Sequence, residues 1–406
     1  MRFLSLDELL PADHRARGVW QFVASLDLSP LYAKIKAVEG GAGRHAVDPR
    51  ILMAIWMLAT LEGISSARKL AELSTRDLAY LWICGGVGVN HHLLSDFRTG
   101  HVEFLDQLLT DSVAALLHQN LATLDRVAQD GMRVRAHAGS GSFRRQGSLE
   151  ECQRQAREQV ELLRQESEAE DKSSGDRRTK AARQRAAQEK EERIQRALEE
   201  LKTLQAKKER RKKGDGENAR ASTTDPEARK MKMADGGFRP AYNVQFATAC
   251  AGQVIVGVDV VNAGADGGQM QPMAEQIERR YQQRPREYLV DGGFATVSDV
   301  ASLESQGIQV FAPVKEESQR QTRGDDPYAR RPADSDEVFR WRQRMSTEEA
   351  RLVYRQRAAT AEHPNAECRN RGLTQFRVRS LAKVKAVVLW HALAFNFLRA
   401  RCLGAS

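Results

Sequence analysis

Apolar residues recur every three or four positions along much of the first 120 residues, the spacing of amphipathic helices. The segment "DPRILMAIWMLATLEGI" (48–64) begins with Asp48 as a helix cap, followed directly by a proline. Helices are also predicted over 66–84, where "STRD" (74–77) suits the start of a further short helix, and over 101–121. Such a cluster fits a DNA-reading helix-turn-helix module or any small helical bundle, and the pattern leaves both open.

The pattern changes to alternation in "RVAQDGMRVRAHA" (126–138), which predicts a strand interrupted at Asp130 and Gly131. Further strands and helices follow after residue 228. Strands are expected over 241–249, 253–261, 286–293 and 308–314, helices over 267–283, 298–307 and 346–362, and a loop over 315–336. The first two of these strands, joined by "CAG" (250–252), form an antiparallel hairpin. We therefore expect a compact α/β unit with a mixed sheet.

A helical segment separates the first strand from the others. Apolar residues at spacings of three and four predict helices over 149–171 and 181–213, with "SSGD" (173–176) as the break between them. This pattern is typical of an antiparallel coiled-coil hairpin. The hairpin ends in "KKERRKK" (207–213), where six of seven residues are basic, and a polar linker is expected over 214–228.

Charge and composition indicate the kind of partner. The chain of 406 residues has a net charge of +9, which favours an anionic partner. The excess is concentrated in 341–406, where 13 Lys and Arg face 4 Glu, whereas 1–120 carries −2. A solvated basic helix face would give the same count. The five cysteines are scattered without a CxxC pair, which argues against a zinc site and a disulfide framework and favours a reducing cytoplasm.

No membrane segment is expected from the sequence. The N-terminus lacks the basic-then-apolar pattern of a signal peptide. The longest apolar stretch (386–398) is too short to cross a bilayer and carries His391 and Asn396.

Three carboxylates are candidates for metal chemistry. Asp130 lies within a strand, Asp291 ends another in "YLVDGGFAT" (288–296), and Glu362 lies on a long helix. Each alone is more often a cap or turn residue, but together on one α/β domain they can hold a pair of Mg²⁺ ions, which prefer oxygen ligands. Asn243 and Gln245 share a strand face that is either the active-site side or the solvent side of an edge strand.

Long ordered blocks of the chain resemble the DDE transposases of bacterial insertion sequences. They include "DPRILMAIWMLATLEGISSARKLAELSTRDLAYLWICGGV", "LSDFR" (94–98), "VAQDGMRVRAHA", "MKMADGGFRPAYNVQFAT", "YLVDGGFAT" and "YRQRAATAEHPNAECRNRGLTQFRVRS". The last block carries a Tyr-x-x-Arg…Glu pattern. The resemblance implies an RNase H-like catalytic domain (123–143 and 229–406), interrupted by the helical hairpin insert (144–228) and preceded by an all-α N-terminal domain (1–122) that is a candidate for binding DNA ends.

The resemblance also implies residue roles. Asp130, Asp291 and Glu362 would bind two Mg²⁺ ions, with Mn²⁺ as a substitute, and catalyse cleavage and strand transfer. Tyr354, Arg357 and Arg369 would contact the terminal DNA strand. Other expected DNA contacts are basic residues of the C-terminal part and of the hairpin: Arg371, Arg377, Arg379, Lys207, Lys208, Arg210 and Arg211.

A homodimer or larger synaptic complex is implied, because two element ends must be held together. The expected location is the cytoplasm of a bacterium, at the nucleoid. Pro364 is expected to kink the helix that aims Glu362. Two alternatives to a transposase remain: a catalytically inactive DNA-binding regulator, and a Mg²⁺-dependent DNA nuclease without strand transfer.

Overall fold

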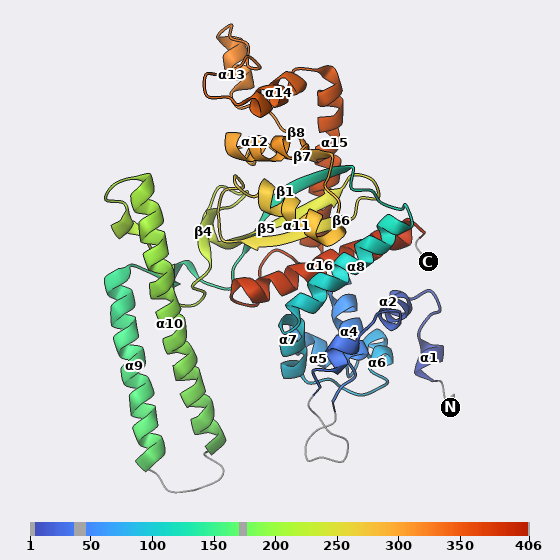
Figure 1. The fold of residues 1–406 in the computed structure, drawn as a ribbon. Coiled ribbons are helices and arrows are strands. Elements are labelled where there is room, and N and C mark those ends of the chain that lie inside the picture. The colour runs from blue at the N-terminus through green and yellow to red at the C-terminus, as the bar shows by residue number, and fades with distance from the viewer. Residues whose placement is uncertain (1–4, 36–45, 170–176, 405–406) are drawn as a thin grey trace.

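The computed structural model of the chain describes residues 5–35, 46–169 and 177–404. They form a mixed α/β structure in which helices cover a six-stranded mixed sheet (Figure 1). The N-terminal helices lie below this sheet and the α9–α10 pair stands beside it in the view of Figure 1. The α/β architecture with a mixed sheet agrees with the sequence pattern.

Short helices make up the described residues before the sheet. Asp48 caps the fourth of them by accepting a hydrogen bond from Arg50 N at 2.8 Å, as predicted. The predicted helix over 66–84 is two helices, since Asp77 accepts from Ala79 N and starts a new one. The helices are α1 (Leu6–Leu9), α2 (Arg15–Ala24), α3 (Ser29–Tyr32), α4 (Pro49–Leu61), α5 (Ala67–Leu73), α6 (Leu78–Ile83), α7 (His91–Thr99) and α8 (Val102–His118).

The main sheet has the order β4-β5-β1-β7-β8. The sixth strand, β6, pairs with residues 243–248 of β5, beyond the part of β5 that pairs with β4. β1, β7 and β8 are parallel neighbours, whereas β5 is antiparallel to β1, β4 and β6. The strands are β1 (Arg126–Arg135), β4 (Arg229–Lys232), β5 (Phe238–Ala249), β6 (Ile255–Val261), β7 (Glu287–Leu289) and β8 (Gln309–Phe311). A separate pair consists of β2 (Phe143–Arg144) and β3 (Ala221–Ser222).

β1 runs through Asp130 and Gly131 without a break, so the predicted interruption is wrong. Asp130 lies opposite Phe246 of β5, and Gly131 lies opposite Gln245. Because paired residues share a face, Asp130 and Gln245 point to opposite sides of the sheet.

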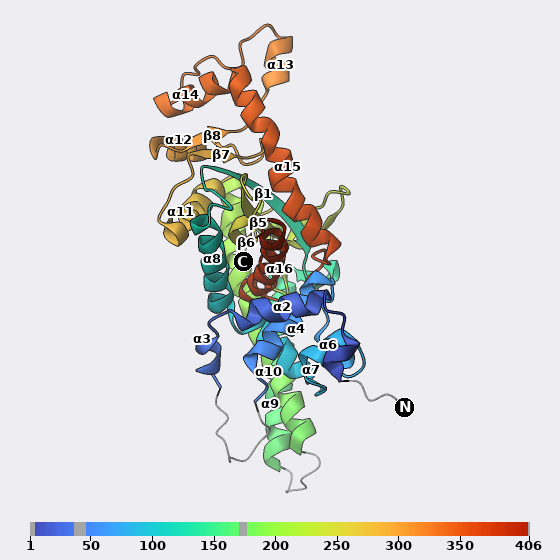
Figure 2. The ribbon, with the colours of Figure 1, turned by 90° about the vertical axis from the view of Figure 1, so that its right-hand side faces the viewer.

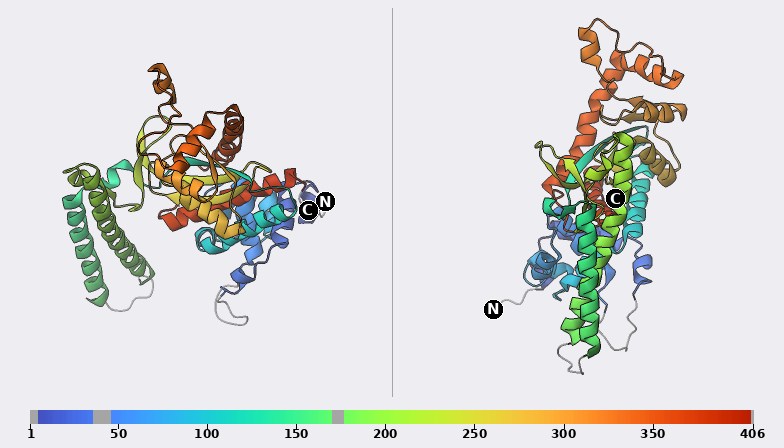
Figure 3. Two further views of the ribbon diagram at one scale, coloured as in Figure 1. Left: turned by 45° about the horizontal axis from the view of Figure 1, so that its top comes forward. Right: turned by 90° about the vertical axis from the view of Figure 1, so that its left-hand side faces the viewer.

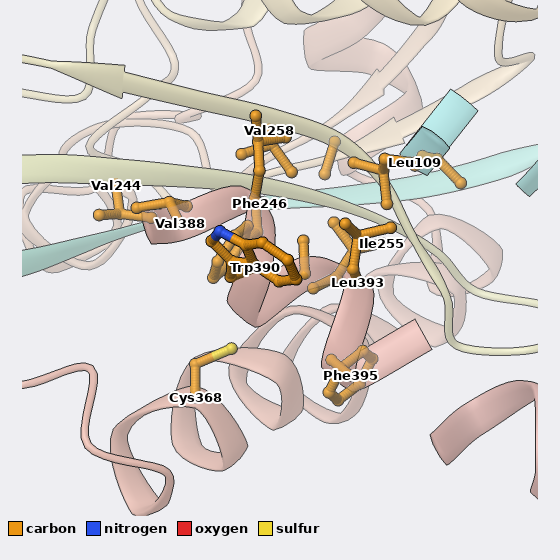
Figure 4. Packing of buried hydrophobic residues seen from close by; sticks show 14 of the residues in the cluster. Leu109, Val244, Phe246, Ile255, Val258, Cys368, Val388, Trp390, Leu393 and Phe395 are labelled. Carbon is orange, nitrogen blue, oxygen red and sulfur yellow. The ribbon is translucent and has the colours of Figure 1, made fainter. Parts of the chain in front are cut away.

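The two faces of the sheet are covered by different helices (Figure 2). One face carries α16 (Leu381–Cys402) and α15 (Glu348–Asn370), and the other carries α11 (Met270–Tyr281). In Figure 4, Val388 and Trp390 of α16 lie against Val244 and Phe246 of β5. Trp390 is 2% exposed, and its Nε1 donates to Arg98 O at 3.0 Å, which joins the N-terminal helices to this core.

α15 differs from the predicted helix at both ends. Its N-cap is Thr347, which accepts from Ala350 N, so the helix begins at Glu348, two residues after the predicted start. It continues through Pro364 to Asn370, eight residues beyond the predicted end. Pro364 and Cys368 are buried, and Cys368 belongs to the main hydrophobic core, so tertiary contacts stabilise the helix past the proline.

The region between β7 and α15 is more helical than expected. It holds α12 (Val297–Ser305), as predicted, and α14 (Asp336–Met345). The predicted loop over 315–336 contains α13 (Glu317–Thr322), a short helix without buried residues.

α9 (Gln146–Ala169) and α10 (Arg177–Arg211) run side by side (Figure 3). The predicted break at 173–176 lies outside the described residues. An apolar cluster joins α9 and α10 to the chain that follows α10; its buried members are Leu149, Ala197, Leu201, Ala219 and Ala221. The predicted linker over 214–228 therefore has a structural role, and its Asp225 is fully buried.

α16 is longer than the apolar stretch in the sequence suggested. Within the described residues it is the one helix whose 22-residue length and composition would suffice to cross a membrane. However, 67% of its apolar window is buried inside the protein. This burial is the behaviour of a core helix.

Candidate active site

The three predicted acids come from separate elements and meet at one arginine. Arg357 Nη2 lies 3.2 Å from Asp130 Oδ1 and 4.0 Å from Asp291 Oδ2. Its Nη1 lies 3.3 Å from Glu362 Oε1. Asp130 and Asp291 are brought together because β1 and β7 are parallel neighbours, and α15 supplies Arg357 and Glu362.

The side chains of the three acids differ in solvent exposure. The side chains of Arg357 and Asp130 are 13% and 16% exposed, while those of Asp291 and Glu362 are 41% and 61% exposed. Burial raises the pKa of Asp130 to about 6, although Arg357 opposes this shift. The arginine thus supplies the positive charge that a buried carboxylate needs.

Asp291 is held in a turn by its own glycines. Gly293 N donates to Asp291 Oδ1 at 2.7 Å, and Phe294 N donates to the same oxygen at 3.3 Å. The other oxygen, Oδ2, is the one nearest Arg357. Asp291 can therefore be both a turn residue and a site residue, because Oδ1 accepts from the turn while Oδ2 faces Arg357.

Asn365 belongs to the same cluster, and the sequence analysis missed it. Its Nδ2 donates to Asp130 Oδ2 at 3.0 Å, and the residue is 4% exposed. The signal was its spacing, because Asn365 lies three positions after Glu362 and so shares its side of the helix. Tyr354 is also near: burial raises the pKa of its phenol, and all three acids raise it further.

The family comparisons match two parts of the chain. Residues 4–100 match the family described as Transposase domain (DUF772), and residues 214–397 match the Transposase DDE domain. The chain belongs to the insertion-sequence DDE transposases. Searches of curated proteins and of solved structures gave no match. The mixed sheet with flanking helices fits the RNase H-like fold that the DDE family implies.

Behind the acids of the transposase, on the opposite face of β1, lies a second polar cluster centred on Asp266. Asn243 Nδ2 and Gln245 Nε2 donate to Asp266 Oδ1 at 2.7 and 2.9 Å. Gln245 Oε1 accepts from Gln129 Nε2 at 2.9 Å, which extends the network along β1. We name Asp266, Asn243, Gln245 and Gln129 the rear network.

The rear network corrects one expectation. Asn243 and Gln245 are at most 1% exposed and face away from Asp130, so they lie neither on the active-site side nor in solvent. Asp266 lies in a turn, where its backbone oxygen accepts from Gln269 N at 3.2 Å, and its side chain is the acceptor of this cluster. A β-carbon on Gly131 would lie 2.7 Å from Gln245 Nε2 and 3.0 Å from Asn243 Oδ1. Gly131 is therefore the residue that lets the network touch the strand carrying Asp130.

The predicted DNA contacts are dispersed. Among the C-terminal ones, Arg369 is exposed, Arg371 pairs with Glu367, and Arg377 donates through Nε to Ser65 Oγ at 2.9 Å. At the end of α10, Lys208 pairs with Asp215 at 3.2 Å, and the other basic residues predicted there are exposed: Lys207, Arg210 and Arg211. Tyr354 and Arg357 are the predicted contacts that lie beside the acids.

The carboxylate oxygens of the three acids fit hard divalent cations, but Arg357 occupies the space between them. No group of three or more His, Cys, Asp or Glu residues in the described part of the chain is arranged to hold a metal ion. Arg357 itself lies among the three acids. Their convergence on one cationic group shows that the site favours positive charge, and Arg357 would have to withdraw before ions enter.

Proposed function

We propose that this transposase cleaves DNA at the ends of its element and joins those ends to target DNA, using Asp130, Asp291 and Glu362 as ligands of two Mg²⁺ ions. Mn²⁺ can substitute. The observation that carries the proposal is the convergence of the three carboxylates on the Arg357 guanidinium. Three acids distant in sequence around one cation are hard to explain as caps.

The bound ions would supply an activated water and neutralise charge at the phosphorus. The protein groups prepare for this. Asn365 and Gly131 N both donate to Asp130, at 3.0 and 2.9 Å, and so fix the orientation of the most buried ligand. The turn at Asp291 leaves one oxygen directed at the site.

Arg357 has two roles in the proposal. Without ions it neutralises the acids; with ions and DNA present it is free to bind a phosphate, for which its planar fork is suited. Tyr354 and Arg369 are proposed to bind the same terminal strand. Arg371, Arg377 and Arg379 are proposed to bind phosphates further along.

The remaining parts are assigned by the same reasoning. Residues 1–122 are proposed to take part in end recognition, and the hairpin within 144–228, with its basic end, to cover DNA outside the site. Two ends must be held together, so the active form is a homodimer or larger synaptic complex. The site of action is the bacterial nucleoid in the cytoplasm.

The test uses purified protein, Mg²⁺ and labelled duplexes carrying the ends of the DNA element that encodes it. Joined products support transposition, cleavage alone supports a nuclease, and binding alone supports a regulator. Asp291→Ala should abolish joining while leaving DNA binding largely intact. The matched control is Asp235→Ala, since Asp235 is exposed and its partner is Arg239. Joining by the Asp291→Ala protein would remove this residue from the mechanism.

A further inference from the structure

The backbone ladder between β1 and β7 ends before it reaches the two aspartates of the site. Ala128 pairs with Leu289 in the last step of this parallel ladder. The next amide after Leu289 donates to Phe311 O of β8 at 3.1 Å. Continuing the register by two residues would place Asp130 opposite Asp291 on one face of the sheet. The ladder therefore stops two residues short of both carboxylates.

At this level β1 and β7 are joined by side chains on the rear face of the sheet. Tyr288 shares a face with Val127, its partner in the ladder, and Gln129 lies two residues along on that face. The Tyr288 hydroxyl donates to Gln129 Oε1 at 2.7 Å, and both side chains are fully buried. Gln129 directly precedes Asp130 in the chain. Tyr288 precedes Asp291 by three residues.

The Gln129 amide also contacts two further elements. Its Nε2 donates to Gln245 Oε1 of β5 at 2.9 Å. The same nitrogen donates to Gln269 O, at the start of α11, at 3.2 Å. α11 covers the rear face, opposite to α15 and α16 (Figure 2). Gln129 thus ties β7, β1, β5 and α11 together directly behind the acids.

The donors and acceptors of this chain of bonds have one possible arrangement. A backbone carbonyl only accepts, so the Gln129 NH₂ must face Gln269 O, and Oε1 must face Tyr288. Burial raises the pKa of the Tyr288 phenol well above its ordinary value, so the hydroxyl keeps its proton and donates. At the other end the Asp266 carboxylate only accepts, which directs the Gln245 NH₂ toward it. The hydrogen bonds therefore run in one direction, from Tyr288 to Asp266.

This arrangement resists a change in strand spacing. If β7 moved away from β1, or if the Gln129 amide rotated, buried polar groups would lose their partners, which is costly. On the front face Asp130 and Asp291 are linked through Arg357, which would have to withdraw before ions enter. The bonds of the rear face do not depend on that arginine, so they persist when the front link is lost.

We propose that Gln129 and Tyr288 are positioning residues that set the separation of Asp130 and Asp291. This inference rests on the proposed function, in which these two acids bind the Mg²⁺ ions. Mg²⁺ requires near-ideal octahedral geometry, and two ions that act on one phosphate lie about 3.5–4 Å apart. A small change in the spacing of β1 and β7 therefore changes the affinity for the ions although no ligand is replaced.

A purely structural role is the alternative, because any buried hydroxyl that is hydrogen-bonded stabilises the fold. Both interpretations predict that Tyr288→Phe, which removes the hydroxyl and keeps the ring, lowers the melting temperature. Only the positioning role predicts that the folded variant also binds the ions more weakly. The ion affinity of the folded protein is therefore the quantity that separates the two.

The experiment uses the full-length protein with a labelled duplex that carries one end of the element. One measurement is the Mg²⁺ concentration that gives half-maximal joining. The other is the dissociation constant of Mn²⁺ from the protein–duplex complex, obtained from the electron paramagnetic resonance signal of the free ion. Groups that hold metal ligands in place contribute about 10–100-fold to metal affinity, and Tyr288 acts one residue further away. Tyr288→Phe should therefore raise both quantities about three- to tenfold.

The matched control is Tyr281→Phe. Tyr281 lies on α11, and its hydroxyl donates to Val256 O of β6 at 2.9 Å, a bond that involves neither β1 nor β7. This variant should lower the melting temperature and leave both ion measurements unchanged. Gln129→Met should reproduce the effect of Tyr288→Phe, and it supplies the same comparison if Tyr288→Phe does not fold. The double variant should resemble Gln129→Met, because the two residues act through one bond.

Three outcomes are decisive. Equal ion measurements for Tyr288→Phe and Tyr281→Phe, with normal joining by the unmodified protein, would leave Tyr288 with a structural role only. Effects of Tyr288→Phe and Gln129→Met that multiply in the double variant would show that the two residues do not act through their shared bond. Absence of Mg²⁺-dependent joining by the unmodified protein would instead remove the proposed function.

Discussion

Gly131→Ala tests whether the rear network positions Asp130. The new β-carbon would overlap Asp266 Oδ1 and lie 2.7 Å from Gln245 Nε2, whereas ordinary contacts begin at 3.4 Å. Either Asp266 withdraws or β1 shifts. Withdrawal by roughly 1 Å would break the two hydrogen bonds that Asp266 accepts, at 2.7 and 2.9 Å, from side-chain amides.

The magnitude follows from those bonds. Hydrogen bonds to a charged group are each worth about 1.5–3 kcal/mol, and the lower entropy of the unfolded alanine chain offsets about 0.4–1 kcal/mol. We expect Gly131→Ala to lower the free energy of unfolding by about 2–5 kcal/mol, measured by urea denaturation. Gly139→Ala is the control, since no atom lies within 4 Å of its added β-carbon, and it should change stability by less than about 0.5 kcal/mol.

A double-mutant cycle assigns the cause. If the clash is with Asp266, the effects of Gly131→Ala and Asp266→Ala should be less than additive, by about 1–2 kcal/mol. Strand joining should also fall while DNA binding persists, because the strand that carries Asp130 is displaced. Additive stabilities, or full joining activity in Gly131→Ala, would show that the network does not position the acid.

Two further predictions concern buried charge. Arg357→Met should destabilise the metal-free protein by about 2–4 kcal/mol, because it leaves Asp130 without its counter-charge. Addition of about 10 mM Mg²⁺ should then raise the melting temperature of this variant more than that of the unmodified protein. Arg355→Gln, on the same helix but 70% exposed, should show neither effect. Burial lowers the pKa of His391 from 6.5 to about 3. Below pH 6.5 the His391 imidazole is therefore protonated in the unfolded chain but stays neutral in the native state. The free energy of unfolding should fall by about 2 kcal/mol between pH 6.5 and pH 5, and His391→Gln should flatten that part of the profile; an unchanged slope would mean that His391 is protonated in the native protein.

Local patterns predicted most elements of the fold. The cap at Asp48 and the alternation of β1 are fixed by side chains adjacent in sequence, so they could be read directly. The errors occurred where distant contacts decide. α15 passes Pro364 because its later residues are buried, and β1 continues through Gly131 because residues 127–135 all pair with β5.

The acids were found by combining pattern with resemblance, but their surroundings were not. Nothing local indicated that Arg357 would bridge all three, since the bridge depends on how α15 lies across β1 and β7. Asn243 and Gln245 were recognised as a polar pair, yet their partner Asp266 is more than 20 positions away.

The sequence by itself determined the element types, the acid residues available for metal binding and the excess of positive charge near the C-terminus. Only the tertiary structure decided which charged and polar groups meet: the acids around Arg357, and the amides around Asp266. The physical reason is range. Capping and periodicity act within a few residues along the chain, whereas electrostatic and packing contacts depend on distances in space that the fold alone sets.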